Sequence, residues 1–305
     1  MNESFWKPGV PRSILLATDL SGRCDRALDR AVLLARRWNA RLVAMTVIEP
    51  DATVPQPGSR LETPGWYVEQ DPLQVAARRL ARDAGTEDVN AVVRVEQGHA
   101  GRNLLQVAEE EGCSLVVTGV ARHEAFARMV LGSTVDWLVR HSQLPVLVVR
   151  ERARGAYRSL VAASDWSPSS KHALESTAGV FPETTVSILH GFDVPFLGML
   201  ESSRDSAIGQ TREQALADGR AFLNELTMPV GAGELPRLVV EHGDPARLLR
   251  LYAQQYDIDL AVVGTHGRSA LFDVVIGSVA KRILEQAPID VMIVRDPHSK
   301  PSLDD

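Results

Sequence analysis

The chain contains 305 residues, of which 45% are hydrophobic and 24% charged, and its formal net charge is −6 at pH 7. This composition is typical of a globular protein and excludes a fibrous or disordered chain, and the length suits two domains of about 150 residues, each with its own core. The acidic balance argues against a nucleic acid partner, and no apolar run approaches the roughly 18 residues that a membrane helix needs.

The N-terminal half begins without the basic segment and apolar core of a signal peptide, so we expect a cytoplasmic protein. Amphipathic runs then alternate with short apolar runs, which predicts parallel strands covered by helices on both faces of a sheet. The first helix places Ala27, Ala31, Leu34, Ala35 and Trp38 on one stripe, and we expect its arginines, Arg30 among them, on the solvent side. The predicted strands of this half are 13–18, 41–48, 90–96, 114–119 and 145–150.

The C-terminal half repeats this order. Ser13 to Asp19 aligns with Ser159 to Asp165, and Gly132-Ser133 aligns with Gly277-Ser278. Ser167 is a natural N-cap, with a proline at the first helical position. The predicted strands of this half are 158–164, 185–192, 237–242, 259–264 and 290–295.

We therefore interpret the chain as two tandem domains, 1–152 and 153–305, with the boundary in the segment 150–157. This linker is too short to let the domains move far apart, so we expect them to pack against one another. The closing strands 145–150 and 290–295 are the predicted contact. With that contact made inside one chain, a monomer is acceptable, and a homodimer would use other surfaces.

The glycines after the fourth strand of the second repeat predict an anion site. Gly264-Thr265-His266-Gly267 follows an apolar strand, and Gly277-Ser278 precedes an amphipathic helix. Glycine lets a phosphate approach the main chain, and a helix N-terminus supplies unpaired N–H groups and a partial positive charge. In the first repeat Gly119, Gly132 and Ser133 are in register, but Arg122 replaces the second glycine. We therefore expect nucleotide binding mainly in the second repeat.

The pattern Gly-x2-Gly-x9-Gly-Ser, with Thr-Asp or Ser-Asp after the first strand, resembles the universal stress protein family over nearly the whole chain, twice. The resemblance implies two five-stranded parallel sheets of the adenine-nucleotide α-hydrolase-like, Rossmann-like type, and ATP as a ligand. In the second repeat it implies that the glycines and the helix after them contact the phosphates. It implies that the residues after the first strand of that repeat contact the nucleoside, and that the main chain of its second strand contacts the adenine. It also implies a phosphate-bound Mg²⁺ near Asp165. The residues carried over are Ala163, Ser164, Asp165, Gly191, Val263, Gly264, Gly267, Gly277, Ser278 and Val279.

Catalytic and metal motifs are absent from the sequence. There is no Gly-x-x-x-x-Gly-Lys-Ser/Thr loop, no Gly-x-Ser-x-Gly elbow, no Cys-x-x-Cys pair and no His-Glu-x-x-His, so we expect ligand binding and no enzyme, with slow ATP hydrolysis left open. Three alternatives stay open. Asp19 and Asp165 could simply cap the helices that follow them. The chain could be an interaction or chaperone-like protein that uses the apolar loop 192–200 to hold a protein partner. It could also be an ATP-splitting enzyme of the same superfamily.

Overall fold

The structure is a computed structural model that describes residues 9–49, 70–85, 89–120, 132–195, 203–227, 236–265 and 276–296. Within this part of the chain, ten strands form one sheet in the order β3-β2-β1-β4-β5-β10-β9-β6-β7-β8. The strands are β1 Ser13–Ala17, β2 Arg41–Ile48, β3 Ala91–Gln97, β4 Leu115–Gly119, β5 Val146–Val149, β6 Ser159–Ala163, β7 Thr185–Phe192, β8 Arg237–His242, β9 Leu260–Gly264 and β10 Asp290–Val294.

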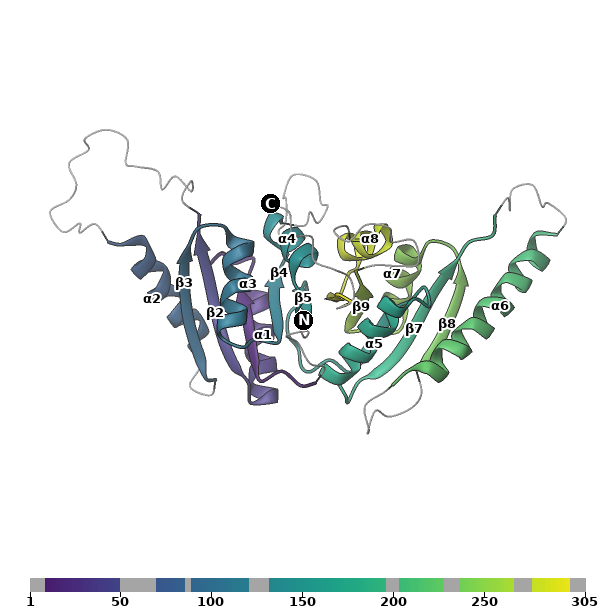
Figure 1. Ribbon diagram of the computed structural model, residues 1–305, viewed down its shortest axis with the longest axis horizontal. Coiled ribbons are helices and arrows are strands. Elements are labelled where there is room, and N and C mark those ends of the chain that lie inside the picture. The colour runs from purple at the N-terminus through teal and green to yellow at the C-terminus, as the bar shows by residue number, and fades with distance from the viewer. Residues whose placement is uncertain are drawn as a thin grey trace, which may run out of the picture.

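Within the described ranges each repeat contributes five parallel strands and four helices, which confirms the expected fold class (Figure 1). The helices are α1 Asp25–Trp38, α2 Pro72–Ala84, α3 Ala100–Glu110, α4 Ser133–His141, α5 Pro168–Val180, α6 Arg204–Glu225, α7 Pro245–Gln255 and α8 Ser278–Gln286. From β1 the chain first adds β2 and β3 on one side, and then returns to add β4 and β5 on the other side. The second repeat does the same, with β7 and β8 on one side of β6 and β9 and β10 on the other. Right-handed crossovers therefore place α1 and α2 on the opposite face from α3 and α4, and α5 and α6 on the opposite face from α7 and α8.

Continuous apolar runs account for the central strands, and apolar stripes account for the helices. β1 and β4 are buried along their whole length, as expected of central strands in a parallel sheet. Helix α5 begins as predicted, because Ser167 accepts a hydrogen bond from the Ser170 N–H and Pro168 occupies the first helical position. Helix α1 buries Ala27, Ala31, Leu34 and Ala35 of its predicted stripe.

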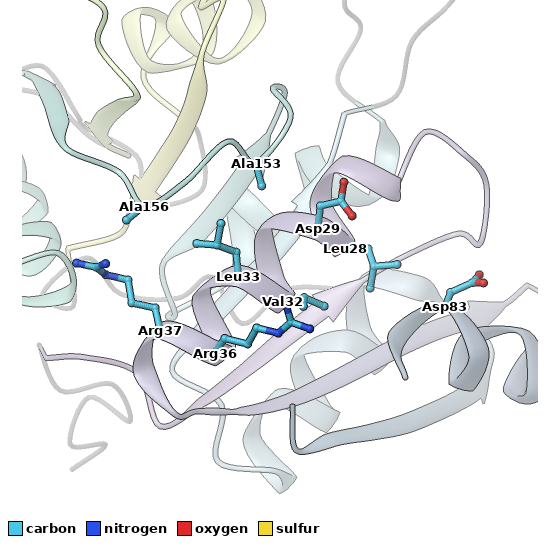
Figure 2. A pocket seen from close by; sticks show the side chains of 9 residues that line it. All are labelled: Leu28, Asp29, Val32, Leu33, Arg36, Arg37, Asp83, Ala153 and Ala156. Atoms are coloured by element: carbon cyan, nitrogen blue, oxygen red, sulfur yellow. The ribbon is translucent and has the colours of Figure 1, made fainter. Parts of the chain in front are cut away.

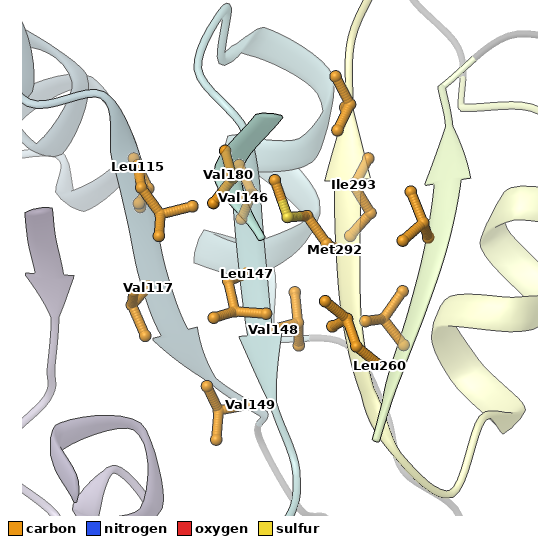
Figure 3. Packing of buried hydrophobic residues seen from close by; sticks show 14 of the residues in the cluster. Leu115, Val117, Val146, Leu147, Val148, Val149, Val180, Leu260, Met292 and Ile293 are labelled. Carbon is orange, nitrogen blue, oxygen red and sulfur yellow. The ribbon is translucent and has the colours of Figure 1, made fainter. Parts of the chain in front are cut away.

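The two repeats join through their closing strands, as predicted. β5 and β10 pair antiparallel, with Leu147 opposite Met292 and Val148 opposite Val291. Figure 3 shows both strands side by side, with apolar side chains gathered around the join. These side chains are fully buried and belong to the same core cluster as both halves of the sheet, so the apolar core runs continuously from one repeat into the other.

Arginines reinforce this join. Arg150 follows β5 and donates a hydrogen bond to the carbonyl of Leu284 in α8, and Arg295 follows β10 and donates to the carbonyl of Arg140 in α4. Both arginines are buried, so each repeat inserts a cation against the carbonyls near the end of a helix in the other repeat. Burial lowers the pKa of Arg150 to about 10, while the nearby Asp290 opposes this shift.

The prediction that Arg30 faces solvent is wrong. Arg30 is only 5% exposed. Its Nε lies 3.4 Å from a carboxylate oxygen of Asp290, its guanidinium lies 4.1 Å from the ring centre of Tyr157, and its Nη1 donates to the carbonyl of Gly155. The helix pattern could not reveal this, because the acceptors come from the linker and from β10, more than 120 residues away in the sequence.

Candidate functional site

The predicted ligand residues of the second repeat lie along one edge of the sheet. Ala163 and Gly264 end β6 and β9, which are neighbours in the sheet, and Gly191 lies near the end of β7. Because these strands are parallel, their carboxyl ends meet at the same edge, where open α/β sheets bind ligands. The described residues of the predicted site therefore lie together at the carboxyl edge of three adjacent strands, β9, β6 and β7.

A tight turn after β6 positions Ser164 and Asp165. The hydroxyl of Ser164 accepts a 3.0 Å hydrogen bond from the Trp166 N–H, and a carboxylate oxygen of Asp165 accepts one of 3.1 Å from the Ser167 N–H. Trp166 has a φ of +62°, an uncommon conformation for a residue with a side chain, so the turn is sharp. Asp165 does not cap α5, because the capping oxygen belongs to Ser167.

Gly191 is needed for close packing at the end of β7. A Cβ atom at this position would lie 2.9 Å from the carbonyl oxygen of Gly243 and 2.9 Å from the ring of Pro245. The preceding residue, His190, stacks on Trp166 with 4.7 Å between ring centres, and its Nδ1 lies 2.8 Å from the Ser164 carbonyl oxygen. The predicted adenine contact thus lies beside the turn that carries Ser164 and Asp165.

The end of β9 meets the start of α8. The Gly277 N–H donates a 2.8 Å hydrogen bond to the carbonyl of Thr265, directly after Gly264. Val263 is buried in β9, and Gly264 packs against the first turn of α5, where an added Cβ would lie 2.9 Å from the Ser169 hydroxyl. At Gly277 φ is −54° and an added Cβ would meet its nearest neighbour at 3.5 Å, so the fold itself does not require glycine there.

Among the residues that the structure describes, no side chain caps the start of helix α8. Gly277 is its N-cap residue, and Ser278 and Val279 form its first turn. Their N–H groups have no intrahelical acceptor, and such groups together with the helix dipole favour an anion. Helices α2, α3, α5 and α7 each receive a side-chain hydrogen bond at the N-cap. Helices α1, α4 and α6 also lack a side-chain hydrogen bond at the N-cap within the described residues, so it is the position of α8, held beside the end of β9 by the Gly277 N–H, that suits its start to a phosphate.

Some predicted residues lie outside the described part of the chain. Gly267 and the neighbouring His266 belong to the segment 266–275, and Arg122 belongs to 121–131. In the apolar loop 192–200, Phe192 and Val194 are buried against Ala215 and Val240, and the residues from 196 onward lie outside the described ranges. The roles proposed for Gly267, Arg122 and the apolar loop stay predictions.

The first repeat has the same turn with different partners. One oxygen of Asp19 accepts hydrogen bonds from the Ser21 N–H, the Ser21 hydroxyl and the Cys24 thiol, and the other lies 3.3 Å from the guanidinium of Arg23. The pKa of Asp19 is lowered: burial raises it, and the hydrogen bonds and Arg23 together outweigh burial. Asp19 does not cap α1, whose N-cap residue is Cys24. The sequence-based interpretation of repeat one rested on Arg122 and missed Arg23, although an arginine four residues after the aspartate was visible.

A hollow of about 700 Å³ lies elsewhere, on the outer face of α1 beside the linker (Figure 2). Leu28, Val32 and Leu33 form its apolar part, and Asp29 and Arg36 are among the charged residues around them. We place the candidate site at the sheet edge instead, because the glycines and the uncapped helix lie there.

The described residues contain no group of three or more His, Cys, Asp or Glu side chains that could hold a metal ion. Within the same part of the chain, no helix is both long and apolar enough to cross a membrane. Cys24 and Cys113 form no disulfide within the described residues.

The sequence model of the universal stress protein family matches this chain twice, at residues 11–150 and 156–295. A universal stress protein of Mycolicibacterium smegmatis is 29% identical over 297 residues, which cover 92% of this chain and 96% of that protein. A universal stress protein of Mycobacterium bovis is 27% identical over 300 residues, covering 95% of this chain and 99% of that protein.

Solved structures show the same fold. A protein of unknown function from Pseudomonas aeruginosa superposes with a TM-score of 0.66 at 17% identity, over 93% of this chain and 92% of that chain. A universal stress protein of Archaeoglobus fulgidus superposes with a TM-score of 0.59 at 15% identity, over 97% of this chain and 99% of that chain. At these identities the likeness concerns the fold, and in both cases it extends over both repeats.

Proposed function

This chain belongs to the universal stress protein family as a tandem member, and from that premise we propose that its second repeat binds ATP as a regulatory ligand. One observation carries the proposal. The hydrogen bond from the Gly277 N–H to the Thr265 carbonyl holds the uncapped start of α8 at the end of β9, beside the turn that carries Asp165. This arrangement supports a phosphate at the α8 N-terminus and a nucleoside near Ser164 and Gly191.

Magnesium would arrive with the nucleotide. The turn after β6 offers the carboxylate of Asp165, and a divalent ion on the phosphates would offset its negative charge. Backbone N–H groups of the glycine segment and of α8 would hold phosphate oxygens. Phosphoryl transfer would also need an oriented attacking group. The sequence carries no motif that supplies one, so we propose binding without turnover, in the cytoplasm, with nucleotide occupancy setting the conformation or the choice of partner.

Isothermal titration of ATP and Mg²⁺ into nucleotide-stripped protein tests this function. We expect about one site per chain in the wild type and loss of binding in Gly267→Arg, which gives the second repeat the residue that the first repeat has. Gly155→Arg is the matched control, because an added Cβ at this exposed linker glycine meets no atom within 4 Å. Absence of heat and of any shift in melting temperature at millimolar ATP would refute the proposal.

A further inference from the structure

Helices α1 and α5 occupy equivalent places in the two repeats and have the same register on the sheet. Gly119 at the end of β4 packs against the backbone of Arg23, and Gly264 at the end of β9 packs against the backbone of Ser169. Arg23 and Ser169 are matching positions of the duplicated sequence. The outer faces of α1 and α5 can therefore be compared residue by residue.

An apolar stripe on this helix is open in the first repeat and covered in the second. Leu28 and Val32 of α1 are only partly buried, and they line the hollow of about 700 Å³ between the linker and the end of α2 (Figure 2). Their counterparts in α5, Leu174 and Ala178, are 1% and 2% exposed. Within the described residues, the stripe is thus covered in one repeat only.

The end of α6 lies against this face of α5 in the second repeat. The Thr227 N–H, two residues past that helix, donates a 2.6 Å hydrogen bond to the carboxylate of Glu175. Leu223 and Leu226, at the end of the same helix, pack against the apolar core. The second repeat therefore shows what fits this face: a helix end that carries leucines and is followed by a backbone N–H.

The first repeat has the matching acceptor without this donor. Asp29 corresponds to Glu175 and lines the hollow. It takes part in no hydrogen bond or ion pair among the described residues. A backbone N–H from another chain can therefore bond to Asp29 as the Thr227 N–H bonds to Glu175.

Arg36 and Arg37 make one end of the hollow positive. They follow Asp29 by two helical turns, about 10 Å along the helix axis. The matching residues of the second repeat are Pro182 and Glu183, so this charge belongs to the first repeat alone. Arg37 pairs with Glu183, but these side chains are 44% and 77% exposed, and an exposed pair is held weakly. Carboxylates are the groups that such guanidinium groups prefer.

We propose that the hollow on α1 is a docking groove for a helix end of a partner protein, with leucines on its last two turns and acidic residues directly after them. The leucines cover Leu28 and Val32, and the first N–H after the helix bonds to Asp29. The acidic residues meet Arg36 and Arg37. This inference does not depend on nucleotide binding, because the groove lies along α1, apart from the residues of the candidate site.

Fluorescence polarisation with a labelled peptide tests this proposal on the full chain. The peptide copies residues 213–227 of this protein, which include the leucines that cover α5, and ends in two added glutamates. We expect saturable binding below about 1 mM peptide. Val32→Asp, which places a charge in the apolar stripe, should weaken binding at least about tenfold. Asp29→Ala, which removes one hydrogen-bond acceptor, should weaken it about fivefold.

The charge at the end of the hollow is tested separately. The peptide without the two glutamates should bind about threefold more weakly, and the double variant Arg36→Ala, Arg37→Ala should abolish this difference. A difference that persists in the double variant would overturn the assignment of the acidic residues to these arginines.

Leu251→Asp is the matched control, because Leu251 lies on α7 and is 46% exposed, so this change should leave peptide affinity unchanged. Asp29 is exposed, and Asp29→Ala keeps the test valid if Val32→Asp fails to fold. Absence of saturable binding at about 1 mM, or wild-type affinity in Asp29→Ala and Val32→Asp, would overturn the inference. So would a dimer of the chain, seen by sedimentation velocity without peptide and lost in Val32→Asp, because the occupant would then be a second copy.

Discussion

The Tyr157 hydroxyl donates a 2.5 Å hydrogen bond to the carboxylate of Asp290, and this bond ties the linker to the last strand of the second repeat. The same carboxylate accepts hydrogen bonds from the N–H groups of Arg150 and Glu151 and forms the ion pair with Arg30. Asp290 is 1% exposed. Complete burial, with further contributions from the charge of Asp290, raises the pKa of Tyr157 well above its ordinary value, so the phenol stays protonated as a donor.

Asp290→Asn should strongly destabilise the protein. The substitution keeps the shape of the side chain but removes the charge that faces the buried Arg30, and loss of one partner from a buried pair costs about 3–5 kcal/mol. Urea unfolding followed by circular dichroism measures this loss. The control is Arg212→Ala, because Arg212 and its partner Glu241 are 49% and 47% exposed, and an exposed pair contributes less than about 1 kcal/mol. Equal effects of the two substitutions would contradict the role assigned to Asp290.

Gly264→Ala should destabilise the protein by about 1–3 kcal/mol, because the new methyl group would press on the Ser169 hydroxyl at 2.9 Å and on its backbone carbonyl at 3.1 Å. Thermal unfolding in the absence of nucleotide measures this effect. Gly277→Ala provides the contrast. Its nearest neighbour is at 3.5 Å and its φ is −54°, so stability should change little. If Gly277→Ala nevertheless loses ATP binding, the glycine serves the ligand and not the fold. A large loss of stability in Gly277→Ala would refute this division of roles.

Two glycines of α6 should respond in opposite directions to alanine. At Gly219 an added Cβ would lie 3.0 Å from two ring carbons of Trp166, so Gly219→Ala should lower the melting temperature although alanine favours helix. At Gly209 nothing lies within 4 Å, and the same change should stabilise the protein by up to about 1 kcal/mol. Differential scanning calorimetry of both variants checks the pair. Stabilisation by both would mean that Trp166 does not press on α6.

The Cys24 thiol should react slowly at neutral pH. Burial raises its pKa from 9.0 to about 11; the Asp19 carboxylate adds to this rise, and hydrogen bonds with the Asp19 backbone and the Thr18 side chain oppose it. The thiolate fraction at pH 8 is then about a hundredfold lower than for a thiol of ordinary pKa, and the greater nucleophilicity of a more basic thiolate recovers about tenfold. We expect alkylation by iodoacetamide to be about tenfold slower than for an unperturbed thiol, with the rate rising toward an inflection near pH 11. The Cys113→Ala variant isolates this thiol, and an inflection at or below pH 9 would refute the prediction.

The strands were predictable because burial on both faces of a parallel sheet produces short continuous apolar runs. β2, β7 and β8 were predicted with the bounds that they have, and the remaining strands differ by one residue at either end. The duplication supplied the domain organisation and the pairing of β5 with β10. Residues at the start of helices were less predictable. Helix α1 begins at Asp25, six residues after Asp19, because Ser21 and Arg23 fold back onto that aspartate.

The polar interior was not predictable, because its partners are distant in the sequence. The sequence around Asp290 predicts only the start of an apolar strand. No residue near Asp290 in the sequence indicates that Tyr157 and Arg30 are its partners. The burial of Ser169 was not predictable for a different reason. A serine in the first turn of a helix is commonplace, and only its burial beside Gly264 sets it apart.

The antiparallel pairing of β5 with β10 has an evolutionary consequence. An association between two separate chains depends on their concentration and, when the chains are identical, holds both copies to one sequence. Joined by a linker of a few residues, the two partners meet at a high effective concentration and assemble at any dilution. Each copy can then change independently. Arg23 facing Asp19 in one repeat, with Ser169 at the matching position of the other, shows that they have done so.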